Sequence, residues 1–297
     1  MNVVVWLLLC LIWGTTWYVI KIGLADLPPF SFAAARFVSA ALIVLAVIRL
    51  QKIPLPKTRR YWALLAATGL LQFGFNYSMV FWSEQYISSG LAAVLQATIP
   101  AFGLLTARVH LPQEKITGRK IAAILIGVAG VATIFAEQLR VDNLTAFAGC
   151  AAVVAGALAA AEASVLTKRF GASLHPASLL LGQMACGLLP LLLIGFLKEG
   201  NPVNFRWTTA AIFSVLYLAV VGTIAAFWLY YWLLKRVESS AAMAIALVTP
   251  LVAVVVGALA LGERLRPQTY AGGALILASV SLIAFRRRRK EPAPAGS

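Results

Sequence analysis

The sequence predicts an all-α polytopic membrane protein with ten transmembrane helices that form two inverted five-helix repeats. Composition is the first reason: 61% of the 297 residues are hydrophobic and only 12% are charged, whereas soluble domains average about 45–50% and about 25%. The second reason is that apolar stretches of membrane-spanning length alternate with short polar connections. The third is that motifs of the first half recur in the second. This composition excludes a disordered chain, a secreted disulfide scaffold and a soluble enzyme.

Each apolar stretch is long enough to cross a bilayer core, which takes about 20 residues of α-helix. The polar segments between the stretches contain prolines and charges, which end helices and require water. They are too short to hold an inserted soluble domain. In chain order, the expected spans are 2–22, 31–48, 61–82, 88–107, 119–136, 143–166, 177–197, 208–233, 239–261 and 270–285. The helix-breaking segments between them are 26–29, 52–57, 112–115, 175–176 and 198–202.

The first stretch, 2–22, is expected to be retained as a helix. A secretory signal peptide has a basic segment before a short apolar core, but here the stretch is long and its basic residue, Lys21, stands at the far end. The cysteines Cys10, Cys150 and Cys186 are odd in number and lie inside apolar stretches. We interpret them as small packing residues rather than a disulfide framework.

The distribution of Lys and Arg predicts the orientation in the membrane. If the N-terminus is cytoplasmic, 18 of these residues fall in cytoplasmic segments and six on the opposite side, while Arg36 lies within the second span. Cytoplasmic loops carry the excess of basic residues, so both termini are expected in the cytoplasm. The net charge of +15 is thereby explained without nucleic acid. The run Arg286–Lys290 is interpreted as a topology anchor, with a contact to anionic lipids or a nuclear signal as alternatives.

The two halves of the chain share three motifs in the same order, with offsets of 151, 150 and 149 residues. Five spans per half is an odd number, so the second half must be inverted, and inverted repeats place a substrate site near the bilayer midplane, often where proline breaks a helix. Pro100 and Pro250 are therefore the expected hinges. The matched segments are 88–93 with 239–242, 98–100 with 248–250, and 112–115 with 261–264, and the expected domains are 1–138, 139–290 and a disordered tail at 291–297.

Polar side chains inside spans are costly and are candidates for function. Those near the centre are neutral, and no carboxylate is expected there, which favours uniport or exchange over proton coupling. Aromatic side chains at helical spacing are also typical of packing, and buried amides either bond between helices or line a wet cavity. The candidate substrate-binding residues are Thr16, Trp17, Gln72, Asn76, Tyr77, Gln96, Glu162, Trp228 and Tyr231.

Two acidic residues lie in or beside spans. Glu84 stands at the outer end of the third span, where an interfacial role is expected. Glu162 precedes Lys168 by six residues, or about 9 Å along a helix. It could bind a substrate ammonium group or form a snorkelling pair with Lys168 or Arg169, and both interpretations stay open.

The fifth and tenth spans carry closely spaced glycines and no inward polar residue. Gly127 and Gly130 lie in the fifth span, and Gly272 and Gly273 in the tenth. Small residues at such spacing let helices approach closely. We expect these spans to serve in packing or in a homodimer, outside the transport path.

Catalysis is not expected. The only histidines are His110 and His175, both in expected loops, and the sequence has no Gly-x-Ser-x-Gly, no His-Glu-x-x-His and no phosphate-binding Gly-Lys-Ser/Thr. An intramembrane enzyme requires a nucleophile with its base, or a metal cluster, and a channel is usually built from a symmetric ring of like groups. No cofactor and no metal are expected.

Five motifs are spread along nearly the whole chain: Trp13–Thr16, Lys21, Arg36-Phe37, Glu84–Ala93 and Leu261–Glu263. Together they resemble the EamA-type branch of the drug/metabolite transporter superfamily. The resemblance implies ten helices from two inverted repeats, and export of amino acids or other small metabolites from the bacterial cytoplasm. Two positions depart from the family pattern: Pro112 stands where Gly is usual, and Glu162 where an aromatic or apolar residue is usual.

These observations predict a multi-pass secondary transporter of a bacterial inner membrane that exports a small molecule by alternating access. Because the expected centre is aromatic and uncharged, aromatic or other bulky apolar amino acids are favoured as substrates. A broad exporter of drugs or metabolites and a non-transporting receptor or structural protein are the alternatives.

Overall fold

The computed structural model describes residues 2–87, 89–261 and 267–284, in which helices joined by turns and irregular connections are the regular structure and no strand occurs. Four of the longer helices begin at a residue whose side chain accepts a hydrogen bond from a first-turn amide, namely Thr117, Asn143, His175 and Thr208. The elements are α1 (Asn2–Leu24), α2 (Pro29–Leu50), α3 (Arg59–Gly69), η1 (Leu70–Asn76), α4 (Tyr77–Ser83), α5 (Ser89–Gln96), α6 (Ile99–His110), α7 (Gly118–Ile134), η2 (Ala136–Gln138), α8 (Leu144–Phe170), α9 (Pro176–Glu199), η3 (Pro202–Asn204), α10 (Thr209–Ala219), η4 (Val220–Ala225), α11 (Ala226–Leu234), α12 (Ser239–Met243), α13 (Ile245–Leu261) and α14 (Pro267–Ala284).

Every expected span coincides with one helical segment in the described part of the chain, which confirms the all-α polytopic class. Eight segments are long and apolar enough to cross a membrane. The other two are α7, with 17 residues, and α14, with 18. The third and eighth spans each contain a π-helical turn, η1 and η4, and the fourth and ninth spans are each broken into two helices.

The packing of the two halves is reciprocal. Helix α1 packs against α10 and α13 of the second half, and α8 packs in the same way against η1 and α6 of the first. The second span of each half packs against the second span of the other, α2 against α9, and the last span of each half does the same, α7 against α14. A twofold axis between two five-helix halves predicts such pairings. The repeat boundary at residues 138 and 139 stays a prediction.

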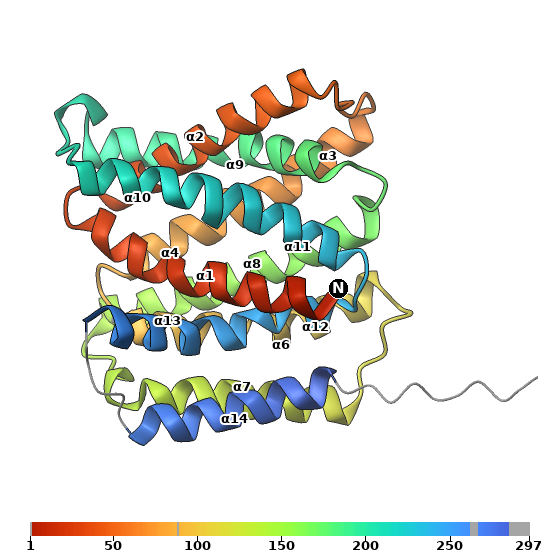
Figure 1. Ribbon diagram of the computed structural model, residues 1–297, viewed down its shortest axis with the longest axis vertical. Helices are drawn as coiled ribbons and strands as arrows, with labels where there is room; N and C mark the ends of the chain where they lie inside the picture. The colour runs from red at the N-terminus through yellow and green to blue at the C-terminus, as the bar shows by residue number, and fades with distance from the viewer. Residues whose placement is uncertain (1, 88, 262–266, 285–297) are drawn as a thin grey trace, which may run out of the picture.

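The helices lie in layers (Figure 1). The pair α7 and α14 forms one edge of the molecule, α2, α3 and α9 form the opposite edge, and α1, α4, α8 and α13 lie between. Glycine explains how the edge pair packs: a Cβ atom on Gly272 would lie 2.4 Å from the carbonyl oxygen of Gly130. The backbones of α7 and α14 therefore touch, as their small residues predict.

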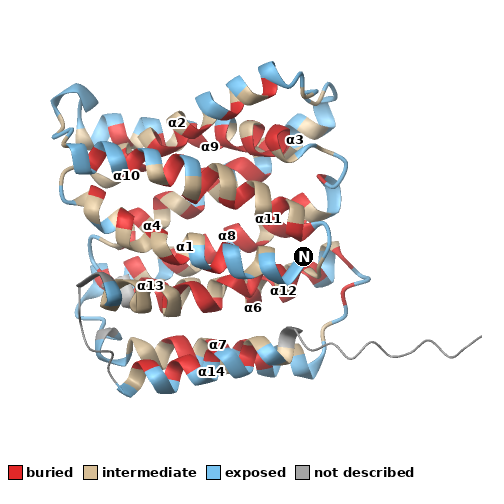
Figure 2. Cartoon of the chain, in the orientation of Figure 1, coloured by how far each residue is buried: buried red, intermediate tan, exposed pale blue. Residues whose placement is uncertain are grey.

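Exposed residues lie on the outward faces of the helices, and buried residues lie toward the interior (Figure 2). Phe37, Phe73 and Leu65 are among the largest fully buried side chains, whereas Phe147, Leu197 and many other large apolar residues are exposed. Because lipid solvates such side chains, this surface suits a bilayer. The start of α1 and the end of α14 lie on the same side of the molecule (Figure 1), as an even number of crossings requires.

Candidate functional site

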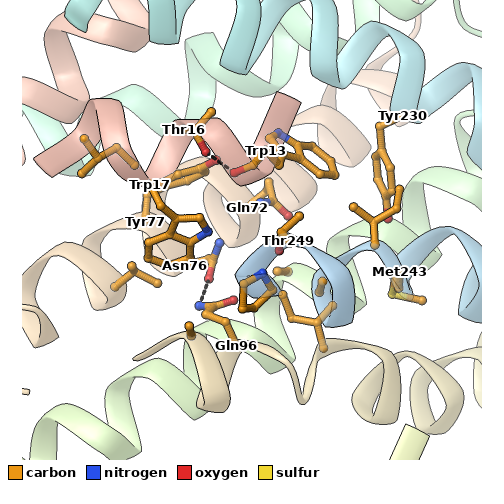
Figure 3. A pocket seen from close by; sticks show the side chains of 18 of the residues that line it. Trp13, Thr16, Trp17, Gln72, Asn76, Tyr77, Gln96, Tyr230, Met243 and Thr249 are labelled. Atoms are coloured by element: carbon orange, nitrogen blue, oxygen red, sulfur yellow. Dashed lines mark hydrogen bonds between the residues drawn. The ribbon is translucent and has the colours of Figure 1, made fainter. Parts of the chain in front are cut away.

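A cavity of about 180 Å³ lies between the two halves (Figure 3). Residues of α1, α2, η1 and α4 form one wall, residues of α5 and α6 another, and residues of α8, α11, α12 and α13 complete it. The cavity touches both broken spans, where α5 gives way to α6 and α12 to α13. Thr16, Trp17, Gln72, Asn76, Tyr77 and Gln96, all predicted from the sequence, line it.

An amide pair crosses this cavity. Gln96 Nε2 donates a hydrogen bond to Asn76 Oδ1 over 3.2 Å, which joins α5 to the π-helical turn η1 (Figure 3). Asn76 is buried, and a Cβ atom on Gly156 of α8 would lie 3.0 Å from its Oδ1 atom. Asn76 is thus held by a neighbouring helix on one side, while Gln96 still presents polar atoms to the cavity.

Aromatic rings form another part of the wall. Trp13 packs against Phe227 and Tyr230, with ring centroids 5.5 and 5.3 Å apart. Tyr77 packs edge-on against Phe37 at 4.9 Å. Such pairs fix one another's orientation, so the cavity has stiff apolar sides next to its amides.

Three predicted site residues lie outside this cavity. Glu162 Oε1 is 2.7 Å from His110 Nε2, so the side chain that Glu162 contacts is neither Lys168 nor Arg169. The Trp228 ring packs edge-on against His175, with centroids 5.2 Å apart. Tyr231 donates its hydroxyl to Gln183 Oε1 in a buried contact. The neighbouring Tyr230 lines the cavity instead, because successive helical residues point about 100° apart.

The expected hinges differ in their local structure. Pro100 occupies the first turn of α6, just after the break between α5 and α6, where a missing amide costs little. Pro250 lies inside α13 and lines the cavity. Its ring removes the amide that the Ala246 carbonyl would accept in an unbroken helix, and Ala246 also lines the cavity.

Sequence reasoning did not select two charged residues of the cavity wall, Arg36 and Glu84. Arg36 is 2% exposed; its Nε donates to Thr223 Oγ1 over 2.8 Å and its Nη2 to the Gly222 carbonyl over 3.1 Å. A basic residue within an apolar span was the available signal. Glu84 follows α4 directly, and burial raises the pKa of its carboxyl to about 7.

The cavity continues at one end of the molecule into a hollow of about 650 Å³. The two share Trp17, Glu84 and Pro250, and the hollow extends past Lys21 to Phe135, where α7 ends. A route therefore leads from the amide pair toward this end of the helices.

Ionic contacts close the opposite end. Glu114, in the connection between α6 and α7, is 9% exposed. Its Oε1 lies 2.6 Å from Lys168 Nζ at the end of α8, and its Oε2 accepts hydrogen bonds from the amide and hydroxyl of Ser239 at the start of α12. Lys120 Nζ lies 2.8 Å from Glu238 Oε2 nearby. These contacts tie the two halves together across the closed end.

Comparisons with known proteins agree with this architecture. The model of the EamA-like transporter family matches residues 1–136 and 147–285. The uncharacterized inner membrane transporter YedA of Escherichia coli K12 is 31% identical over 93% of this chain and 88% of its own. A probable amino-acid metabolite efflux pump of Salmonella typhimurium LT2 is 30% identical over 95% of each chain. One protein of known crystal structure has a TM-score of 0.83 over 98% of each chain at 18% identity, a likeness of fold alone.

Proposed function

Because the chain belongs to the EamA-like transporter family, and is thus a multi-pass membrane transporter, we propose that it exports amino acids with aromatic or other bulky apolar side chains from the bacterial cytoplasm. The cavity between the halves carries this proposal, since it combines an amide pair with a stiff aromatic wall. The name of the Salmonella relative, a probable amino-acid metabolite efflux pump, supports it.

The chemistry of the cavity suits such a substrate. The side-chain amides of Gln96 and Gln72 offer donors and acceptors to its polar groups, each hydrogen bond contributing about 0.5–1.5 kcal/mol. The Trp17 and Tyr230 rings offer apolar faces to a bulky side chain. The Ala246 carbonyl next to Pro250 adds a backbone acceptor suited to an ammonium group.

We place the protein in a bacterial inner membrane, because YedA is described as an inner membrane transporter. Both termini are proposed to be cytoplasmic on the 18-to-6 distribution of basic residues. The end closed by Glu114 is then cytoplasmic, and the open hollow faces outward. A phosphatase fused after Lys290 should be inactive, and activity there would reverse the orientation. The α7–α14 pair is the proposed surface of any homodimer.

Transport is tested by counterflow in proteoliposomes that contain the purified protein. Vesicles loaded with unlabelled phenylalanine, tryptophan or leucine should accumulate the labelled amino acid transiently, while protein-free vesicles should not. Broad stimulation by unrelated amines and dyes would favour the drug or metabolite exporter. If no compound produces counterflow, a receptor or structural role is favoured.

The amide pair gives a prediction for single residues. Asn76→Ala and Gln96→Ala should each lower counterflow about 5- to 15-fold without lowering expression, because each removes a hydrogen-bonding group of the cavity. The double variant should lose less than the product of the single effects, since the two side chains share one bond. Glu162→Gln is the matched control and should transport normally. Normal flux in both alanine variants together with lost flux in Glu162→Gln would move the site to Glu162.

The proposed hinges at Pro100 and Pro250 give a second prediction. Replacing Pro100 and Pro250 with alanine adds a backbone amide at each position and should slow transport while the protein still folds. The main reason is that an amide at position 250 gives the Ala246 carbonyl a helical partner and so makes α13 harder to bend. The variant's flux and melting temperature should be compared with those of the unaltered protein. Unchanged flux would rule out these two positions as hinges.

A further inference from the structure

The cavity wall contains a buried positive charge that an uncharged site does not explain. Arg36 of α2 lines the cavity with 2% of its surface exposed. Among the described residues, no carboxylate lies within ion-pairing distance of its guanidinium. Glu84, the acidic residue of the wall, lies seven positions after Tyr77, or about 10 Å along a helix.

The groups that do contact Arg36 are neutral. Thr223 and the Gly222 carbonyl accept its hydrogen bonds, and the Phe37 and Tyr77 rings lie 5.1 and 5.4 Å from its guanidinium carbon. These contacts orient the guanidinium but leave its charge without a counter-ion. Ionisable residues inside membranes are costly, pair with one another or with backbone carbonyls, and mark substrate pathways. In the part of the chain that the structure describes, Arg36 has the carbonyl but not the opposite charge.

Two broken spans add positive potential to the same cavity. Ile99 and Ile245 line it, and they are the first residues of α6 and α13, helices of 12 and 17 residues. The first turn of a helix carries a partial positive charge. Transporters with broken helices aim such N-termini at the anionic groups of their substrates.

We propose that Arg36 binds the carboxylate of the transported compound, so that the site selects carboxylate-bearing substrates over their uncharged or amine-only analogues. This rests on the proposed function and adds a residue to it. A Cβ atom on Gly222 would lie 2.8 Å from Thr16 Cγ2 and 3.5 Å from Arg36 Nη2. The guanidinium thus lies beside α1, close to the predicted site residues, and its fork of donors fits a carboxylate with two hydrogen bonds.

Arg36 also has a structural contact that the experiment must separate from binding. Its bond to the Gly222 carbonyl falls in the π-helical turn η4, where it could serve only to hold that turn. A structural role predicts that removing Arg36 impairs transport of every substrate alike. A carboxylate-binding role predicts that only substrates with a carboxylate are affected.

The test compares phenylalanine with phenylalaninamide, which lacks the carboxylate, in counterflow. The unaltered protein should prefer phenylalanine. Arg36→Gln keeps an amide donor for η4. It should raise the KM for phenylalanine about 10- to 100-fold and leave the KM for phenylalaninamide nearly unchanged. Arg36→Lys should recover part of the preference for phenylalanine. Thr223→Val, which removes the acceptor of Nε but keeps the charge, should preserve the ratio of the two KM values.

An equal loss for both compounds in Arg36→Gln, or no preference in the unaltered protein, would overturn the proposal. Ligand-induced thermal stabilisation gives a second readout that does not need transport. Phenylacetate should raise the melting temperature of the unaltered protein more than that of Arg36→Lys, and equal shifts would also overturn the proposal. Phenylacetate stabilisation without any counterflow would contradict the export function and leave the anion site standing.

Discussion

Replacing Glu114 with glutamine is expected to open the end of the protein that is closed in this structure. Glutamine keeps an acceptor for Ser239 but removes the negative charge that lies 2.6 Å from Lys168 Nζ. Both side chains are largely buried, with 7% and 15% of their surfaces exposed. Removing one partner of a buried pair costs about 3–5 kcal/mol, and this cost applies to the closed state alone if Lys168 reaches water when the end opens. The closed state should lose about 100-fold or more in relative population.

Thiol accessibility measures this shift. The three free cysteines are first replaced with alanine, and a single cysteine is placed at Met243, which lines the cavity. A membrane-impermeant maleimide added from the side of Glu114 should then react faster in Glu114→Gln than in the parent. Lys120→Gln is the matched control, because the Lys120–Glu238 pair is more exposed and such pairs contribute about 0–1 kcal/mol. Equal labelling rates in Glu114→Gln and the parent would show that this pair does not hold the end closed.

The span pattern could be predicted from the sequence because apolar length alone specifies membrane crossing. The expected second span, 31–48, falls within α2, and proline marks the start of α2, α9 and α14. The π-helical turns were not predictable. The segment Leu70–Asn76 has no local signal for a wider turn, and its shape is tied to packing against α8 and α9, which are distant in sequence.

In the site, too, some residues could be placed from local sequence spacing, while others depend on contacts between residues that are distant in the sequence. Helical periodicity was enough to place Asn76 and Tyr77 on one wall, but it could not separate Tyr230 from Tyr231, which point to different sides of α11. The position of Glu162 depends on His110, the last residue of α6, which lies 52 residues earlier in the chain. The sequence shows Arg36 as a charge within a span, but only the fold reveals that no carboxylate lies beside it in the described part of the chain.

Adding one methyl group at Gly187 is expected to destabilise the whole fold. A Cβ atom there would lie 2.3 Å from the Gly69 carbonyl oxygen and 2.6 Å from Phe73 Cβ. A Cβ atom on the facing helix would clash in the same way, since a Cβ atom on Gly69 would lie 2.2 Å from the Gln183 carbonyl oxygen. The backbones of α9 and the α3–η1 junction are therefore in contact, and neither carbonyl can move without separating the helices.

Gly187→Ala should consequently lower the melting temperature in detergent and the yield of monodisperse protein, because overpacking of this kind costs about 1–3 kcal/mol or more. Transport should fall as well, since η1 carries Gln72 and Asn76 on the cavity wall. Gly118→Ala is the matched control: nothing lies within 4 Å of its added Cβ at the start of α7, and alanine there should be neutral or stabilising by about 0.5–1 kcal/mol. If Gly187→Ala melts at the same temperature as Gly118→Ala, α9 and the α3–η1 junction do not pack as closely as described, and the support they give to the amide pair must come from elsewhere.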